Sequence, residues 1–162
     1  MIQIQKANPS HVDGIVKVCT DANWATYSEF YSKHYIESII DEFYKPERIL
    51  QEVMHDSKDW GGYFVAIDRG EVIGAAGGGM IDDTSGEIYV LYLNPNRRNE
   101  GVGSLLLRAI TEQQKEWGIK EQWVSVQKGN QKAIPFYEAK GFDYQYEEKS
   151  GEYTSVRLKR NI

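Results

Sequence analysis

Arg97-Arg98-Asn99-Glu100-Gly101-Val102-Gly103-Ser104 separates a predicted strand, Glu87 to Asn94, from a predicted helix whose apolar face begins at Leu105. A glycine loop that enters a helix presents free backbone N–H groups and the positive end of the helix dipole, which together favour a bound anion such as phosphate. The loop lacks the Gly-Lys-Ser/Thr of a Walker motif and the third glycine of a dinucleotide fingerprint, so ATP and NAD are poor candidates. The alternative is a glycine-rich connection that binds no ligand.

A second motif lies downstream, from Asn130 to Phe142, and reads NQKAIPFYEAKGF. Arg98 to Gly103 matches the R/Q-x-x-G-x-G/A motif of the GCN5-related N-acetyltransferases, and the downstream segment resembles their N-x-x-A-x-x-F-Y-x-x-x-G-F motif. The strand before the loop, Ile88 to Pro95, is also similar to the central strand of that family. The resemblance extends from about Tyr63 to Phe142. The segment before it matches in layout only, with a faint similarity to the polyamine-acetylating branch.

The resemblance implies that acetyl-CoA binds in a V-shaped gap, where the strand of Glu87 to Leu93 parts from the strand of Gln122 to Gln127. Unpaired backbone groups of the first strand would then pair with the pantetheine amides, and the glycine loop would hold the pyrophosphate. Asn130 is expected to reach the cofactor, although an Asn at this position is equally an ordinary helix cap. Glu100 brings a negative charge into the loop. The cofactor-binding residues implied are Leu91, Tyr92, Leu93, Arg98, Asn99, Glu100, Gly101, Val102, Gly103, Ser104, Asn130 and Phe136.

Two residues are the candidate catalytic groups. Glu87 occupies the strand position where several family members carry a general base, which is needed because an alkylamine with a pKa of about 10.4 is almost fully protonated near neutral pH. Tyr137 matches the motif position of the acid that protonates the departing thiolate. The structural alternatives are a solvent-facing strand Glu87 and a Tyr137 that fills the core beside Phe136.

The acceptor is expected to be a primary amine, such as a small polyamine, that attacks the acetyl group directly in a ternary complex. Trp24, Tyr27 and Tyr31 lie in the segment that covers the acceptor pocket in the family, and aromatic rings near acidic residues suit a cationic amine. The alternative is that these rings only pack helices onto the sheet. Acetylation of a protein N-terminus or lysine, or a CoA-binding sensor domain without turnover, are the rival functions.

Outside the two motifs, hydrophobic periodicity predicts one mixed sheet with helices on both sides. We expect a GNAT-like α/β fold with a mostly antiparallel sheet and splayed central strands, formed by one acetyltransferase domain over residues 1–162. The triplet Gly77 to Gly79 indicates either a close backbone approach or a bulged strand. The segment from Trp24 to Tyr31 has weak periodicity. Strands are predicted at 2–6, 63–67, 71–80, 87–94, 122–127, 142–147 and 153–159, and helices at 11–23, 32–44, 46–55, about 104–117 and 130–140.

Composition narrows the function further. The 162 residues carry a formal charge of −5, so no global basic field for nucleic acid exists. Cys19 is the one cysteine, and the three histidines show no ligand spacing, so neither a disulfide framework nor a metal site is expected. No segment has the length of a membrane span or the pattern of a signal peptide, which favours a cytoplasmic protein. A homodimer could form through the C-terminal strands between Phe142 and Lys159.

Overall fold

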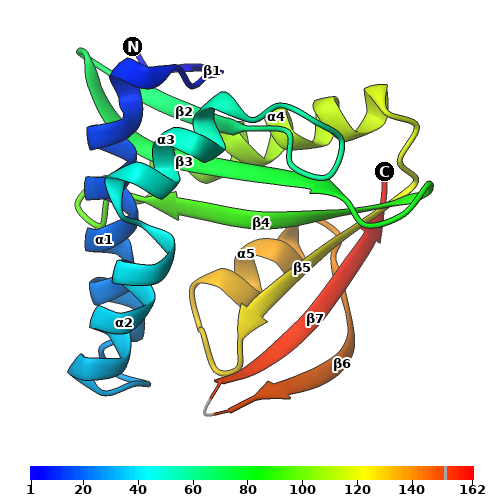
Figure 1. The fold of residues 1–162 in the computed structure, drawn as a ribbon. Coiled ribbons are helices and arrows are strands. Elements are labelled where there is room, and N and C mark those ends of the chain that lie inside the picture. Colours follow the sequence, from blue (N-terminus) through cyan, green and yellow to red (C-terminus); the bar gives the residue numbers. More distant parts are fainter. Residues whose placement is uncertain (152) are drawn as a thin grey trace.

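The computed structural model describes residues 1–151 and 153–162 (Figure 1). In this part of the chain seven strands form one sheet, in the order β1-β2-β3-β4-β5-β7-β6. All neighbouring pairs are antiparallel except β4 with β5, which confirms the predicted mixed and mostly antiparallel sheet. The strands are β1 (Gln3–Lys6), β2 (Tyr63–Asp68), β3 (Glu71–Met80), β4 (Ser85–Leu93), β5 (Glu121–Gln127), β6 (Asp143–Ser150) and β7 (Tyr153–Asn161).

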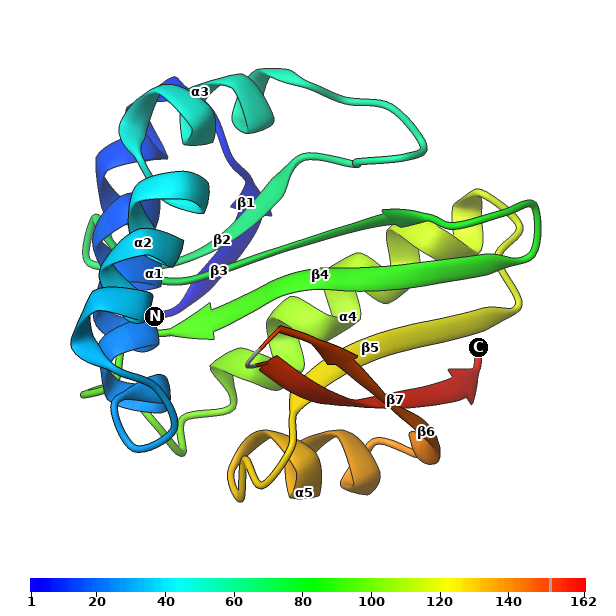
Figure 2. The ribbon, with the colours of Figure 1, turned by 60° about the horizontal axis from the view of Figure 1, so that its bottom comes forward.

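Helices cover both faces of this sheet (Figures 1 and 2). Alternate residues of a strand point to opposite faces, and β3 shows it: Ile73 packs in the core under α4, whereas Val72 packs in the core under α1 and α3. Both cores are apolar, and together they bury most of β2 and β3, whereas β6 is exposed along nearly its whole length. The helices are η1 (Pro9–His11), α1 (Val12–Tyr27), α2 (Lys33–Phe43), α3 (Pro46–Met54), α4 (Val102–Glu116) and α5 (Ala133–Ala139).

Local signals in the sequence set most of the helix boundaries. The hydroxyl of Ser32 accepts a hydrogen bond from the Tyr35 N–H and caps α2, and Pro46 begins α3. Helix α1 differs from the prediction because it continues through Trp24 to Tyr27. Tyr27 there contacts the sheet, with its hydroxyl 3.4 Å from that of Tyr92. Tertiary contact thus extends a helix that periodicity alone would end at Asn23.

The glycines of β3 mark a close approach of the chain. A Cβ on Gly77 would lie 2.3 Å from Cη2 of Trp60, and one on Gly79 would lie 2.0 Å from the carbonyl oxygen of Asp59. The register between β3 and β4 also shifts between Gly77 and Gly78. The close backbone approach and the bulged strand, which were the two alternatives for this triplet, are therefore both present. The loop before β2 lies directly on β3, and β3 itself contains the irregularity.

The two central strands separate as predicted. β4 and β5 pair only from Ser85 with Glu121 to Ile88 with Val124. Beyond this point β4 continues beside β3 as far as Leu93, and β5 continues beside β7. Figure 2 shows the gap widening from the closed end between these strands. The divergence leaves one edge of β4 without a neighbouring strand.

A buried polar network fastens the closed end of the gap. Gln114 of α4 donates from Nε2 to the carbonyl oxygen of Glu87 at 3.0 Å, and its Oε1 accepts from Gln122 Nε2 at 3.1 Å. Both glutamine side chains are fully buried. Since buried amides are stable only when hydrogen-bonded, this network ties α4 to β4 and β5 where the strands begin to part.

Candidate active site

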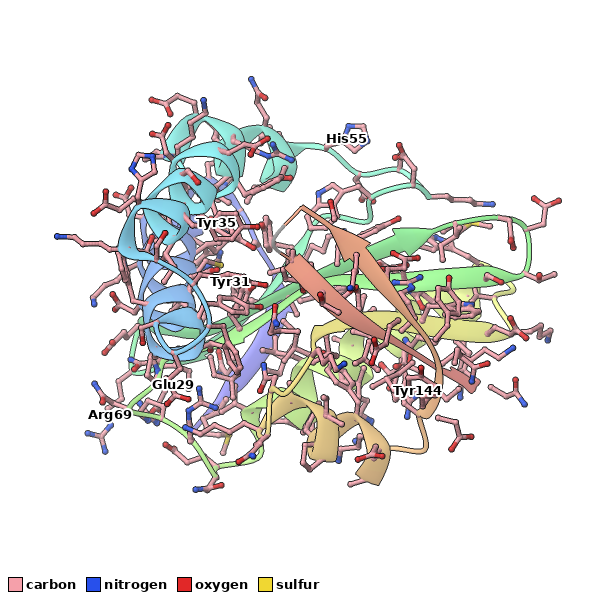
Figure 3. The ribbon with its side chains drawn as sticks, turned by 90° about the horizontal axis from the view of Figure 1, so that it is seen from below. Glu29, Tyr31, Tyr35, His55, Arg69 and Tyr144 are labelled. Atoms are coloured by element: carbon pink, nitrogen blue, oxygen red, sulfur yellow. The ribbon has the colours of Figure 1, made fainter. Side chains whose placement is uncertain are left out.

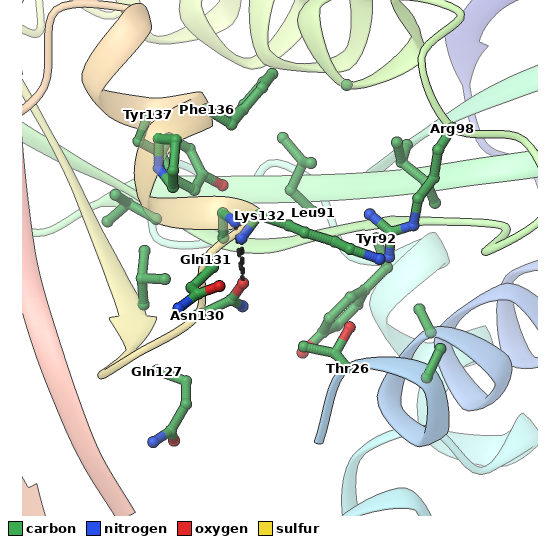
Figure 4. Close-up of a pocket in the computed structure, with 18 of the residues that line it drawn as sticks. Thr26, Leu91, Tyr92, Arg98, Gln127, Asn130, Gln131, Lys132, Phe136 and Tyr137 are labelled. Carbon is green, nitrogen blue, oxygen red and sulfur yellow. Dashed lines mark hydrogen bonds between the residues drawn. The ribbon is translucent and has the colours of Figure 1, made fainter. Parts of the chain in front are cut away.

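A cavity of about 1090 Å³ fills the gap between the diverging strands (Figure 4). Its walls come from five elements: β4, the loop before α4 with the first turn of that helix, β5, α5 and the C-terminal part of α1. The cavity therefore lies between both arms of the divided sheet. It is large enough for a ligand the size of a coenzyme.

The glycine loop forms one end of this cavity. Gly101 is the N-cap of α4 and has φ +80°, a left-handed conformation that glycine adopts without strain. A Cβ on Gly101 would meet no atom within 4 Å, so the backbone lies open to a ligand. No side chain caps the helix, so the N–H groups of its first turn have no partner within the helix. Val102, Gly103 and Ser104 line the cavity at this point.

Two adjacent arginines of the loop differ in their partners. Arg97 binds Asp68 at 2.7 Å and Glu100 at 2.8 Å, and the hydrogen bond from Arg97 lowers the pKa of the Glu100 carboxyl. Glu100, expected among the cofactor-binding residues, is therefore directed at Arg97 and does not line the cavity. Arg98 does line it, as does Asn99, which has φ 65°. The negative charge that the sequence brings into the loop is paired outside the site.

The wall formed by β4 contains the three predicted residues Leu91, Tyr92 and Leu93. On one side these residues pair with β3, at Ala76, Ala75 and Gly74. On the other side no described strand pairs with them. Backbone groups along this edge are thus available to hydrogen-bond an extended ligand, which is what the amides of pantetheine require.

Asn130 and Phe136 lie on the opposite wall. The Oδ1 atom of Asn130 accepts hydrogen bonds from the backbone N–H of Lys132 at 3.2 Å and of Ala133 at 3.0 Å, so Asn130 caps the turn that leads into α5, whose own N-cap residue is Lys132. Asn130 also lines the cavity, so its two expected roles share one position. The ring of Phe136 lies 3.4 Å from the position of a Cβ on Gly103. Helices α4 and α5 therefore meet at a residue without a side chain.

Tyr137 is buried on the same wall, with 5% of its surface exposed. Its ring packs edge-on against Phe136 and Phe142, at centroid distances of 5.1 and 5.2 Å. The hydroxyl points into the cavity in Figure 4. Burial raises the pKa of Tyr137 well above its usual value, so the phenol keeps its proton and acts as a donor. The ring of Tyr137 thus packs in the core, while its hydroxyl reaches the cavity.

Glu87 lies at the closed end of the gap and does not line the cavity. Its two carboxylate oxygens accept hydrogen bonds from Arg157 of β7 at 2.6 and 2.8 Å, and both side chains are about nine-tenths buried. The guanidinium group of Arg157 also stacks over Trp123, 5.3 Å from the ring centroid. Glu87 is thus neither a solvent-facing residue nor an unpaired carboxylate, since Arg157 holds it in place.

Aromatic residues enclose the other end of the cavity. Tyr27 lines it. Tyr31, also expected to bind the acceptor, is not among the lining residues, but its hydroxyl donates a hydrogen bond to the lining residue Gln127 at the end of β5. Tyr31 also stacks on Tyr153 of β7, with 6.0 Å between centroids. Figure 3 shows Tyr31 between α1 and the C-terminal hairpin. Trp24, which lies three residues before Tyr27 on α1, does not line the cavity.

Sequence reasoning missed several lining residues. Lys132 extends from the start of α5 into the cavity (Figure 4), and it occupies a variable position of the downstream motif. Ser125 and Gln127 lie on β5 beyond its last contact with β4. The prediction that these strands diverge was the one available signal, because it makes the end of β5 a wall.

The one cysteine and the potential metal-ligating side chains do not form a site in the described ranges, 1–151 and 153–162. Cys19 is fully buried in α1 and outside the cavity lining, and burial raises the pKa of its thiol well above the usual range. No group of His, Cys, Asp and Glu side chains in these ranges could hold a metal ion. The same ranges contain no helix that is both long and apolar enough to cross a membrane.

A parallel strand pair that opens over the N-terminus of a helix defines a protein that binds an elongated, anionic ligand between its strands. The model of the acetyltransferase (GNAT) family matches residues 18–142, and the chain belongs to this family. The predicted family and fold are confirmed. Three features fit coenzyme A: the open backbone at Gly101, the edge of β4 that pairs with no described strand, and Arg98, which forms no ion pair among the described residues. The protein is therefore an N-acetyltransferase, and acetyl-CoA is its acetyl donor.

Similar proteins agree with this assignment. A spermidine N(1)-acetyltransferase of Thermoplasma acidophilum is 29% identical over 142 residues, which cover 87% of this chain and 88% of that protein. The uncharacterized N-acetyltransferase YuaI of Bacillus subtilis is 31% identical, and the match covers 98% of this chain and 90% of that protein. The crystal structure of PaiA N-acetyltransferase from Thermoplasma acidophilum, in complex with coenzyme A, has a TM-score of 0.86 at 26% identity and covers 99% of both chains.

Proposed function

We propose that the protein transfers the acetyl group of acetyl-CoA to a small primary amine, by direct attack in a ternary complex. The observation that carries this proposal is a set of contacts that cross the acceptor end of the cavity. The connection between α1 and α2 extends to the far wall, where Tyr31 contacts Gln127 and Tyr153, and the ring of Phe30 lies 3.5 Å from the position of a Cβ on Gly129. An extended protein segment needs an open groove, whereas a small amine fits an enclosed end.

The chemistry of the enclosing residues supports a cationic acceptor. Aromatic faces attract ammonium groups, and the carboxylate of Glu29 lies in the same lining as Tyr27. The relative named as a spermidine N(1)-acetyltransferase points to the same class of substrate. A small polyamine is therefore the first acceptor to test, and acetylation of a protein N-terminus or lysine is the rival.

Two residues have proposed catalytic roles. Acetyl-CoA supplies an activated thioester, and the amine must be neutral to attack it. We assign the removal of the amine proton to Glu87, acting through a water molecule because Arg157 occupies both carboxylate oxygens in the direction of β7. Tyr137 donates a proton at the thioester sulfur. The desolvation that raises the pKa of this phenol also raises that of a thiol beside it, so the transfer stays feasible.

Thiol release across an acceptor panel tests the proposed function. We expect spermidine and other small primary amines to give kcat/KM values at least about tenfold above those of peptides with a free N-terminus or a lysine, because the enclosed end excludes a polypeptide. Mass spectrometry of the products separates acetyl transfer from simple hydrolysis. A peptide acceptor that surpasses every small amine would reject the proposal and favour protein acetylation.

The variant Glu87→Gln tests the base. We expect kcat/KM to fall about tenfold or more at pH 6.5, where nearly all of the amine is protonated, and to approach the wild-type value above pH 9, where the neutral fraction rises. The substitution also leaves the buried Arg157 without a counter-charge, so the melting temperature should fall. An unchanged affinity for CoA, measured by calorimetry, shows that the site remains folded. A pH-rate profile parallel to that of the wild type would remove Glu87 from the mechanism.

A further inference from the structure

The cavity contains two cationic side chains without a carboxylate partner. Arg98, on the loop before α4, and Lys132, at the start of α5, both line it. Among the described residues neither of them forms an ion pair, whereas Arg97, directly beside Arg98, is bound to Asp68 and Glu100. Arg97 thus forms ion pairs with both Asp68 and Glu100. The positive charge of Arg98, by contrast, faces the cavity.

Lys132 belongs to the wall opposite the glycine loop. Its backbone N–H is fixed by the 3.2 Å hydrogen bond to Asn130, while its side chain extends across the cavity in the direction of Arg98 (Figure 4). Two like charges that point into one cavity repel each other, and a bound anion removes that repulsion. In a chain of net charge −5, this local positive field favours a phosphate group.

We propose that Lys132 is a phosphate-binding residue for the acetyl donor, which it holds from the α5 side while the glycine loop and Arg98 hold it from the α4 side. The phosphates of CoA then lie between both arms of the gap. Lys132 is a point charge on a flexible stem, so its position is adjustable and its contribution is electrostatic. The proposal concerns the donor alone and does not depend on which amine is the acceptor.

Calorimetric titration with CoA and three variants tests this proposal. We expect Lys132→Gln to weaken CoA binding about five- to tenfold and to reduce its dependence on salt, because one screened charge contact is lost. Lys132→Arg should keep most of the affinity. Lys128→Gln is the matched control, since Lys128 lies in the same connection, is exposed, and pairs with Glu147 at 3.0 Å outside the cavity. Its affinity should equal that of the wild type.

Two further ligands identify the group that Lys132 holds. With dephospho-CoA, an effect of Lys132→Gln that persists assigns the contact to the diphosphate, and one that disappears assigns it to the 3′-phosphate. With S-acetylpantetheine, which lacks phosphate, kcat/KM should be the same for the wild type and Lys132→Gln. An equal loss with S-acetylpantetheine, or an unchanged affinity for CoA, would overturn the proposal, because Lys132 would then act on the fold of the wall or not at all.

Discussion

Tyr137→Phe is expected to lower kcat by about 10²-fold or more while the dissociation constant of CoA stays at its wild-type value. The substitution removes only the hydroxyl, and a positioned proton donor contributes on this scale. The ring keeps its edge-on contacts with Phe136 and Phe142, so the wall of the cavity is preserved. Steady-state thiol release with a good acceptor, beside calorimetry with CoA, measures both quantities.

Loss of a buried hydroxyl can also act through stability, and a second tyrosine controls for that. Tyr63 has 1% of its surface exposed, lies in the core under α1 and α3, and is outside the cavity lining. Tyr63→Phe should therefore retain turnover even if its melting temperature falls. Turnover of Tyr137→Phe within about threefold of the wild type would show that the phenol is a packing residue, as the structural alternative states.

The second large effect is expected from Gly101→Glu, which should weaken acetyl-CoA binding by more than about 100-fold. Gly101 is the N-cap of α4, and its Cβ position is open to the cavity. A carboxylate there would occupy the place of a phosphate and repel its charge at the positive end of the helix dipole. Calorimetric titration with acetyl-CoA, on protein freed of copurified CoA, measures the loss.

Backbone strain is the competing cause, because Gly101 has φ +80° and any other residue is strained there. Gly101→Ala carries the same strain without charge or length, so we expect only a small loss of affinity. Gly118→Glu, at φ +85° beyond the other end of α4 and also with open space at Cβ, applies strain and charge away from the cavity. If Gly101→Ala binds as poorly as Gly101→Glu, the electrostatic account of the cradle is wrong.

Local sequence determined the elements that form the cofactor site. The anion-binding loop needs only a strand, two glycines and a helix start, all within Arg97 to Leu105. The cap on α2 at Ser32 and the start of α3 at Pro46 are likewise short-range effects of single residues. The site residues that the two motifs contain line the cavity, with the exception of Glu100. Backbone chemistry acts over a few residues, which is why it can be predicted from them.

Charge pairing depended instead on residues distant in the chain. Arg157 reaches Glu87 across 70 residues, because β7 pairs with β5 and brings the two side chains to one face of the sheet. Asp68 lies 29 residues from Arg97, and their contact sets which of two adjacent arginines faces the cavity. A carboxylate in the sequence carries no indication of a partner that lies this far along the chain. The role of each charged group therefore follows from the assembled sheet.

The acceptor residues were also divided by the tertiary structure and not by their position on the helix. Tyr27 and Trp24 are equally aromatic and only three residues apart, yet Tyr27 lines the cavity and Trp24 does not. Lys132 enters the cavity from a motif position that admits any residue. The sequence by itself determined the glycine cradle, which rests on local backbone geometry. Its two motifs indicated the family, and the parting of the central strands was expected from that resemblance. Only the tertiary structure decided which side chains share the cavity and which charges there have no ion-pair partner among the described residues, because sheet register and the packing of helices on the sheet bring distant residues together.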